Sequence, residues 1–112
     1  MAFTLESTKQ GNAAVLILSG RMDAESAPRF ESACAQQLAD GMTHIVLDMT
    51  GLQYVSSMGI RSFVLIGKQA KAGGGAVLLC GMKGFVKEVF DMTYVTSLFP
   101  LFESVEAAIA SL

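Results

Sequence analysis

Short apolar runs and longer segments with helical periodicity alternate along the chain. The β-rich runs 3–8 and 14–19 flank a polar turn that contains glycine, which predicts an antiparallel hairpin at the start of the chain. The later apolar runs Ile45–Leu47 and Ala76–Cys80 are too short for helices, as expected of central strands covered on both faces. A short edge strand is expected at Leu98–Phe99, immediately before a proline.

Four longer segments, at about 23–40, 57–72, 82–93 and 104–112, carry apolar residues at three- and four-residue steps and are predicted to be helices. Strands and helices alternate after residue 20, and right-handed crossovers then predict an α/β fold. We expect a mostly parallel sheet of four to five strands with an antiparallel start and about four helices. The predicted inward-facing residues are Ala27, Phe30, Cys34 and Leu38; Ile60, Phe63, Val64 and Gly67; Val86, Val89, Phe90 and Thr93; and Val105, Ala108, Ile109 and Leu112.

Local residues indicate where these helices begin and end. Asp23 is a good N-cap for the first helix, although a proline further on leaves open a start nearer Ser26. Gly41 and the run Gly73–Gly75 are expected to end the first and second helices. Ser104 is expected to cap the last one.

The composition limits the classes of protein to which the chain can belong. Hydrophobic residues make up 52% of its 112 residues and charged residues 16%, which excludes intrinsic disorder and predicts a single domain over residues 1–112. Part of the apolar surface is then free to serve a protein partner. The net charge of −2 provides no basic field for nucleic acid. No apolar run approaches the roughly 20 residues of a membrane span, and the N-terminus lacks a signal-peptide pattern, so we expect a cytoplasmic protein without membrane insertion.

Residues that commonly carry catalysis or bind metals are sparse. Cys34 and Cys80 lie far apart in the sequence without a CxxC motif or a neighbouring histidine, which favours buried free thiols over a metal site or a disulfide. His44 is the one histidine, and its place at the start of an apolar run favours a structural role. A nucleotide-binding enzyme of flavodoxin-like outline is disfavoured because there is no GxGxxG motif after the first strand and no P-loop. We therefore expect no enzymatic activity, cofactor or metal.

The segment Thr50–Arg61, TGLQYVSSMGIR, carries the candidate chemistry. In an open α/β sheet, functional sites collect where strands end and helices begin, because the free N–H groups of a helix start favour negative charge. Ser56 and Ser57 stand where the second helix starts, and Gly59 follows in its first turn, where packing or close backbone approach would explain it. Ser56 could be an ordinary N-cap while Ser57 presents a hydroxyl that accepts phosphate. The other interpretation is that the serine at the helix start is only an N-cap and that the segment accepts no phosphate.

The run Val55–Ile60, VSSMGI, resembles the signature loop of STAS domains, in which an apolar residue precedes Asp or Ser, then Ser or Thr, a small residue, Gly and an aliphatic residue. Leu18–Asp23 is similar to the family's Gly-x-x-Asp stretch before the first helix. Leu47–Leu52 resembles the strand exit, marked here by an aspartate and a threonine, and Phe102–Ala108 resembles the family's ending. By these segments, in this order, the chain is identified as a member of the STAS family, of the stand-alone anti-sigma factor antagonist type.

The resemblance implies a phosphorylation switch. Ser57 aligns with the serine that a partner anti-sigma factor, acting as a serine kinase, phosphorylates, and a separate phosphatase of PP2C type would restore the unmodified form. Unmodified, the protein would bind the anti-sigma factor and release a sigma factor, and so regulate transcription by partner switching. Ser56 stands where many family members carry aspartate. The residues expected around the phosphosite are Ser56, Met58, Gly59, Asp23, Asp48 and Thr50.

The outer face of the second helix is the predicted partner surface. Met58 and Leu65 are apolar on a face that is usually charged, which suggests a docking stripe beside the acceptor serine. An alternative function retains the fold without the switch, as an adaptor subunit of a signalling scaffold or of a membrane-transport complex, in which Ser57 is only a cap. The predicted partner-binding residues are Met58, Arg61, Ser62, Leu65 and Gln69.

Overall fold

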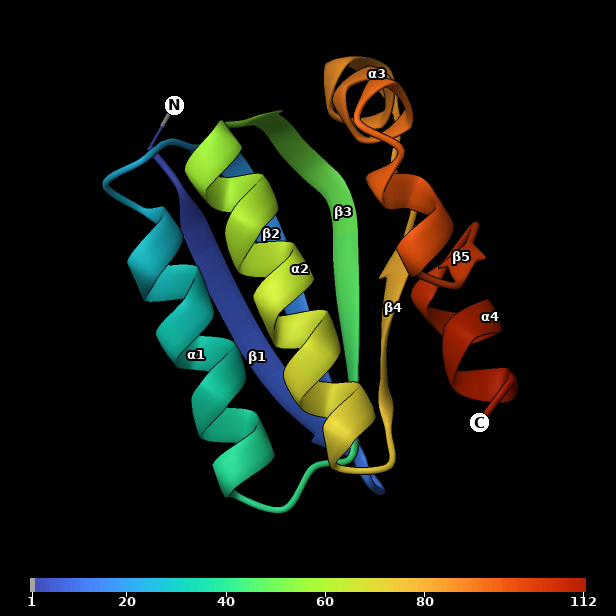
Figure 1. The fold of residues 1–112 in the computed structure, drawn as a ribbon. Helices are drawn as coiled ribbons and strands as arrows, with labels where there is room; N and C mark the ends of the chain where they lie inside the picture. Colours follow the sequence, from blue (N-terminus) through green and yellow to red (C-terminus); the bar gives the residue numbers. More distant parts are fainter. Residues whose placement is uncertain (1) are drawn as a thin grey trace.

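Five strands form one sheet in the order β1-β2-β3-β4-β5 in the computed structural model, which describes residues 2–112 (Figure 1). β1 pairs with β2 in antiparallel fashion, and the other three pairings are parallel. This confirms the predicted mostly parallel sheet with an antiparallel hairpin at its start. The strands are β1 (Thr4–Gln10), β2 (Ala13–Met22), β3 (His44–Val55), β4 (Ala76–Cys80) and β5 (Leu101–Phe102).

The helices cover the two faces of the sheet unequally. α1 and α2 lie side by side over one face, and the shorter α3 and η1 continue this layer beyond α2 (Figure 1). α4 packs against β3, β4 and β5 and covers part of the opposite face. No helix within residues 2–112 has the length and apolar character needed to cross a membrane. The helices are α1 (Ala27–Ala39), α2 (Ser57–Ala72), α3 (Gly84–Met92), the 3₁₀ turn η1 (Val95–Leu98) and α4 (Val105–Ala110).

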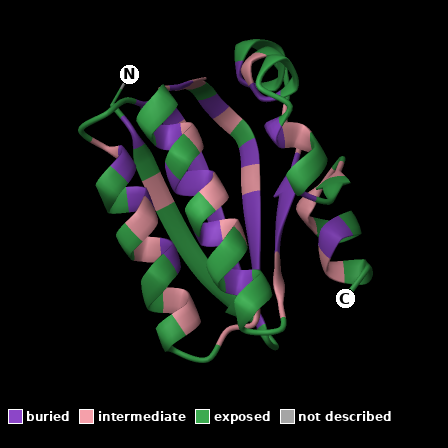
Figure 2. Cartoon of the chain, viewed as in Figure 1, coloured by how far each residue is buried: buried purple, intermediate pink, exposed green. Residues whose placement is uncertain are grey.

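Alternate residues of the central strands supply two separate cores. On β2, Leu16 and Leu18 join the larger core under α1 and α2, whereas Val15 joins the smaller core under α4. Figure 2 shows the buried residues concentrated on the central strands and on the sides of α1 and α2 that face them. In the larger core, the Phe63 ring of α2 lies between Phe30 of α1 and Phe90 of α3, with ring centroids 4.6 and 5.2 Å away. The Phe63 ring therefore links α2 to both α1 and α3.

Some predicted boundaries are wrong. Leu98–Phe99 is not a strand: residues 95–98 form η1, and the edge strand is formed by Leu101–Phe102, after the proline. The proline therefore separates two elements instead of ending a strand. The first helix starts at Ala27 with Ser26 in the N-cap position, so the alternative start nearer Ser26 is confirmed and Asp23 is not the N-cap.

The inward-facing side of α2 also differs from the predicted stripe. Ile60 and Val64 pack against the larger core but are only half-buried, and the half-buried Gly67 receives the Phe99 ring that follows η1. Thr93 and Leu112, assigned to the inner faces of the last two helices, are exposed. The residues of α2 that are buried are Gly59, Ser62, Phe63, Ile66 and Ala70.

Candidate functional site

The backbone where β3 passes into α2 is held firmly. Ser56, with extended backbone, is the N-cap of α2, and its Oγ accepts a hydrogen bond from the Gly59 N–H at 3.1 Å. The N–H of Ser56 donates to the carbonyl of Met22, at the end of the neighbouring strand β2, at 2.8 Å. The first turn of α2 is thus fixed to both the helix and the sheet.

Ser57 is the first residue of α2, and its side chain is exposed. Within residues 2–112, no side-chain hydrogen bond of Ser57 is found, in contrast to the occupied Oγ of Ser56. The two adjacent serines therefore divide the roles as the sequence suggested: Ser56 caps the helix and Ser57 presents its hydroxyl to solvent.

Gly59 allows the helix start to lie close to the sheet. A Cβ at this position would lie 2.7 Å from Cγ2 of Val55 and 3.0 Å from Sδ of Met22. A side chain here would have to displace those of Val55 and Met22, so close packing, and not an unusual backbone conformation, explains the glycine. The position of the Ser57 hydroxyl thus depends on a small residue two positions further on.

Replacing Ser56 by alanine should lower the free energy of unfolding by about 1 kcal/mol, because the Gly59 N–H loses its acceptor. The melting temperature should fall by about 4 °C, measured by circular dichroism. The matched change Ser57→Ala removes a hydroxyl that caps nothing, and should leave the free energy of unfolding within about 0.5 kcal/mol. Equal losses in the two variants would contradict this division of roles.

Asp23 lies beside the start of α2. It follows Met22, which pairs with Val55 in the parallel ladder of β2 and β3. Its carboxylate accepts hydrogen bonds from the N–H and the hydroxyl of Ser26, both at 2.9 Å, and these bonds lower its pKa below the ordinary value. Asp23 is therefore ionised at neutral pH and is held by its own loop.

Asp48 and Thr50 are not brought to Ser57. They were expected at the exit of the third strand, but β3 stays paired with β2 up to Val55, and shifts in the pairing register let it pass Asp48 and continue. The Asp48 carboxylate accepts a hydrogen bond from the Thr50 N–H at 3.1 Å, which is local turn chemistry within the strand. Val55 lies five residues beyond Thr50, or about 16 Å along the strand.

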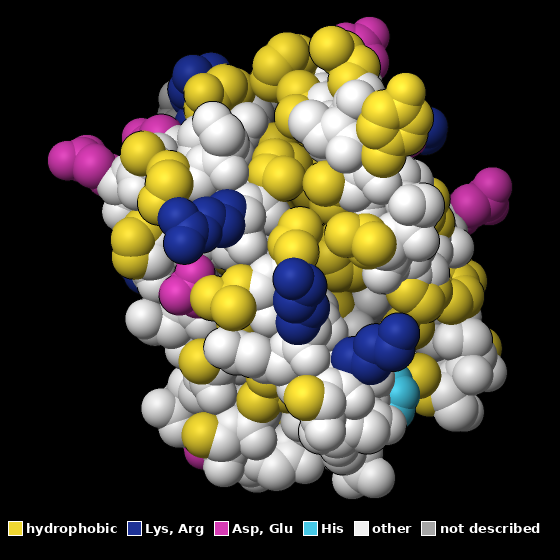
Figure 3. Space-filling model, in the orientation of Figure 1, with side chains coloured by type: hydrophobic (Ala, Val, Ile, Leu, Met, Phe, Trp, Pro, Cys, Tyr) yellow, Lys and Arg dark blue, Asp and Glu magenta, His cyan; other side chains and the backbone are white. Residues whose placement is uncertain are grey.

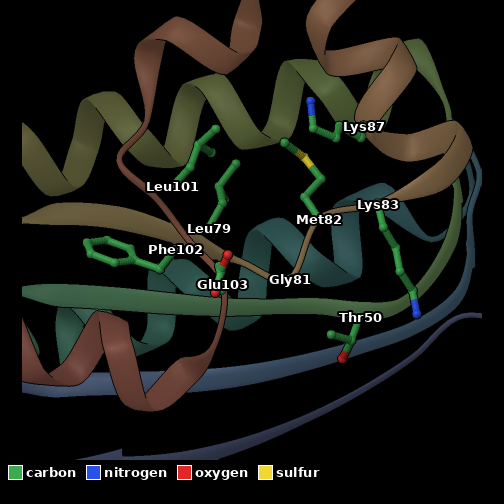
Figure 4. Close-up of a pocket in the computed structure, with 9 residues that line it drawn as sticks. All are labelled: Thr50, Leu79, Gly81, Met82, Lys83, Lys87, Leu101, Phe102 and Glu103. Atoms are coloured by element: carbon green, nitrogen blue, oxygen red, sulfur yellow. The ribbon is translucent and has the colours of Figure 1, made fainter.

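Thr50 belongs to a different hollow, at the carboxyl ends of β4 and β5. This cavity of about 500 Å³ has a mainly apolar lining with two lysines. Figure 4 shows Leu79, Met82 and Leu101 on one side of it and Thr50 on the other. The Lys87 ammonium group is already paired with Asp91 at 2.7 Å. Thr50 therefore lines a cavity to which Ser57 does not contribute.

The residues predicted to form a partner surface on α2 are exposed except at one position. Met58 and Leu65 are 47% and 39% exposed, and Arg61 and Gln69 are exposed as well. Ser62 is only 4% exposed and donates a hydrogen bond to the Glu31 carboxylate of α1 at 3.0 Å, so its expected place on the outer face is wrong. The reason is that α1 packs against this side of α2.

A stacked group near the end of β3 was missed by the sequence reasoning. The Tyr54 ring, near the end of β3, lies parallel to the ring of Phe85 in α3, with centroids 5.9 Å apart. The Arg21 guanidinium from β2 lies over the same Tyr54 ring, at 4.1 Å from its centroid. Phe85 is 51% exposed. The one signal in the sequence was an aromatic residue in α3 outside its apolar stripe.

The cysteines carry no accessible chemistry. Cys34 and Cys80 are both free and buried, and burial raises their pKa values to about 12 and about 11.

His44 is half-buried at the start of β3, where its Nδ1 forms a hydrogen bond with the Thr43 hydroxyl at 2.9 Å. Within residues 2–112, no three His, Cys, Asp or Glu side chains lie close enough to hold a metal ion.

Comparisons with known proteins agree on one family. The sequence profile of the STAS domain matches residues 4–108. A relative from Bordetella bronchiseptica, named "Putative anti-sigma factor antagonist BtrV", is 36% identical over 97 residues, which cover 87% of this chain and 84% of the relative. These matches span nearly the whole chain.

Solved structures share the fold at low sequence identity. An anti-sigma factor antagonist from Mycobacterium paratuberculosis superposes with a TM-score of 0.86 at 20% identity, over 98% of this chain and 93% of that one. The cell fate determinant SpoIIAA of Bacillus, in its phosphorylated form, superposes with a TM-score of 0.76 at 19% identity, over 98% of each chain. At such identity the likeness concerns the fold.

Proposed function

The chain belongs to the STAS domain family, among the anti-sigma factor antagonists, and from this membership we propose that phosphorylation of Ser57 controls its binding to an anti-sigma factor. In this proposal the unmodified chain binds an anti-sigma factor with serine kinase activity. The sigma factor that the anti-sigma factor was holding is then released. Phosphorylation by the same kinase ends the interaction, and a phosphatase of PP2C type reverses it. Because these partners act on transcription, we place the chain in the cytoplasm.

The observation that carries the proposal is the exposed Ser57 hydroxyl on a firmly capped helix start. In the transfer, Oγ of Ser57 forms a bond to the γ-phosphorus of ATP, the bond from that phosphorus to the bridging oxygen breaks, and the hydroxyl proton goes to a base of the kinase or to solvent. The product carries about −1.5 to −2 charges, which the N–H groups at the start of α2 stabilise by about 0.3–1 kcal/mol. The fold therefore tolerates the modification.

Partner binding is the step that phosphorylation changes. A protein surface that covers Ser57 would have to desolvate the phosphate, at a cost of several kcal/mol. A hundredfold loss of affinity requires only about 2.8 kcal/mol. One phosphoryl group is thus sufficient to separate the two proteins while the antagonist stays folded.

The neighbouring surface suits a protein contact. Met58 and Leu65 present apolar side chains along α2, and the Arg21, Tyr54 and Phe85 stack lies at the same edge of the sheet. Aromatic rings, arginine and methionine are the side chains enriched at protein interfaces. We assign the first contacts of the anti-sigma factor to these residues around Ser57.

Ser56 can fill the N-cap position in place of an aspartate. Serine and aspartate are both good N-caps, and the Ser56 Oγ accepts the hydrogen bond that an aspartate oxygen would accept. The exchange removes one negative charge beside the acceptor. A phosphate on Ser57 is therefore repelled less in this chain than beside an aspartate.

The test is phosphate transfer by an anti-sigma kinase encoded in the same genome. The purified chain is incubated with each such kinase and Mg-ATP, and its intact mass and phosphopeptides are measured. We expect one phosphoryl group on Ser57, none in Ser57→Ala, and full uptake in the matched variant Ser56→Ala. An adaptor without a switch would take up no phosphate with any kinase, and that result would overturn the proposal.

A further inference from the structure

The charged residues of α2 are all basic, although the chain as a whole has a net negative charge. The helix contains Arg61, Lys68 and Lys71 and no aspartate or glutamate, whereas the whole chain has ten acidic and eight basic residues and a net charge of −2. All three basic side chains are exposed. Exposed helices usually mix both signs, often in pairs three or four residues apart. The charge of α2 is therefore not balanced within its own helix.

Neighbouring elements do not balance it either. The two salt bridges among residues 2–112 are Lys9–Asp40 and Lys87–Asp91, and neither includes a residue of α2. The acid of α1 that contacts α2 is Glu31, and it accepts a hydrogen bond from Ser62. Arg61, Lys68 and Lys71 thus have no ion-pair partner in the described part of the chain.

An apolar groove runs beside these cations. Val64 and Gly67 of α2 and Leu98 and Phe99 at η1 line a hollow of about 240 Å³, with two lysines of α2 in its wall. Leu98 is 60% exposed. A Cβ on Gly67 would lie 2.8 Å from Cε1 of Phe99, so the glycine allows the phenyl ring to form the floor of the groove. Figure 3 shows Lys and Arg side chains over α2, beside hydrophobic side chains that gather between α2 and the α3 and η1 segment.

We infer that α2 and this groove form a docking face for an acidic, amphipathic segment of the anti-sigma factor. We call it the α2 face, and it comprises Met58, Arg61, Leu65, Lys68, Lys71 and the groove. The inference rests on the proposed function and adds the chemistry of the partner: apolar residues that enter the groove, and aspartate or glutamate opposite the cations. The contact then extends from Ser57 along the length of α2.

The same charges give phosphorylation a second effect. A phosphate on Ser57 adds about −1.5 to −2 charges at one end of a face that carries three positive ones. The attraction for an acidic partner is thereby weakened at the Ser57 end of α2, nearest Arg61, in addition to the local cost of covering the phosphate. The exchange of partners depends on both effects.

Two other occupants fit less well. Anionic lipid surfaces are recognised by clusters of about four to eight basic residues, and α2 has three. The strongly apolar side of α2, with Phe63 and Ile66, is buried against the sheet and cannot enter a bilayer. A second copy of the chain would set one cationic helix against another if the two α2 faces met. An acidic protein segment has neither disadvantage.

The test measures the affinity of the anti-sigma factor that phosphorylates Ser57 in the experiment above, without ATP. Lys68→Glu should weaken binding about 10-fold or more at low salt, mainly through slower association. Wild-type affinity should also fall between about 0.05 and 0.5 M salt. The control Lys9→Glu makes the same charge change on β1, away from α2, and should change affinity by less than about twofold.

The outcomes separate this inference from the proposed function. If no anti-sigma factor binds or phosphorylates the chain, the proposed function fails. If one does, but Lys68→Glu and Lys9→Glu bind alike while both variants melt like wild type, the α2 face is not the acidic partner's site. Sedimentation of the chain with vesicles of phosphatidylserine and phosphatidylcholine, lost in Lys68→Glu, would assign the face to membranes instead and overturn the inference.

Discussion

Replacing Ser57 by aspartate should lower the affinity for the anti-sigma factor at least about 100-fold and leave the melting temperature within about 2 °C of wild type. The side chain at position 57 is exposed and caps nothing, so the fold loses no contact. An acidic residue in the first turn of a helix is favourable. A partner that covers position 57 must instead bury a carboxylate. Calorimetric titration gives the affinity, and circular dichroism gives the melting temperature.

Two controls make this result specific. Ser57→Ala removes the phosphate acceptor without adding charge and should bind as wild type does. Ser32→Asp adds the same charge on an exposed position of α1 and should also bind as wild type does. Undiminished binding by Ser57→Asp would count against a partner that covers Ser57, and an equal loss in Ser32→Asp would indicate a general charge effect.

Replacing Gly75 by alanine should lower the free energy of unfolding by about 3 kcal/mol or more. A Cβ at this position would lie 1.5 Å from the carbonyl oxygen of Thr43, which is backbone and cannot rotate away. Gly75 connects the end of α2 to β4, and Thr43 immediately precedes β3. The substitution would therefore push apart the starts of two adjacent central strands. Chemical denaturation measures the loss.

The neighbouring residue Gly73 provides the matched control. Its φ is −88°, and a Cβ there would lie 3.6 Å from the Ala70 carbonyl oxygen, an ordinary contact distance. Gly73→Ala should therefore change the free energy of unfolding by less than about 0.5 kcal/mol. Equal stability of the two alanine variants would show that Gly75 does not lie so close to Thr43.

Local signals in the sequence were sufficient to locate the start of α2. A capping serine, a following serine and a glycine in the first turn predicted a helix from Ser57, and the helix begins there. The apolar runs predicted β4 with its observed ends, because a short buried strand depends mainly on its own composition. These features depend on residues close to one another in the chain.

Several side-chain contacts between residues distant in the sequence were not predicted, although the general arrangement of the sheet was. The outward placement of Ser62 failed because Glu31, far away in the sequence, meets it across the contact of α1 with α2. The predicted stripe of α2 lies only partly on its most buried side, because the segment of η1 covers a second side of the helix, where Gly67 receives the Phe99 ring. Asp48 was placed near the phosphosite because the sequence does not reveal that β3 continues through a register shift.

The stacked group near the end of β3 was not predicted for the same reason. Arg21, Tyr54 and Phe85 come from three different elements, and only the strand order and the placement of α3 bring them together. Sequence periodicity assigned none of them to the core, which left their function open. The stacked group is therefore a product of the fold, whereas the helix start that exposes Ser57 is encoded locally.

The most direct measurement compares one preparation of the chain before and after phosphorylation on Ser57, by titration with the anti-sigma factor. We expect that the unmodified chain binds, that the phosphorylated chain does not bind at the same concentrations, and that removal of the phosphate by a phosphatase restores binding. Equal affinity of the two forms, with Ser57 phosphorylation verified by mass spectrometry, would contradict it.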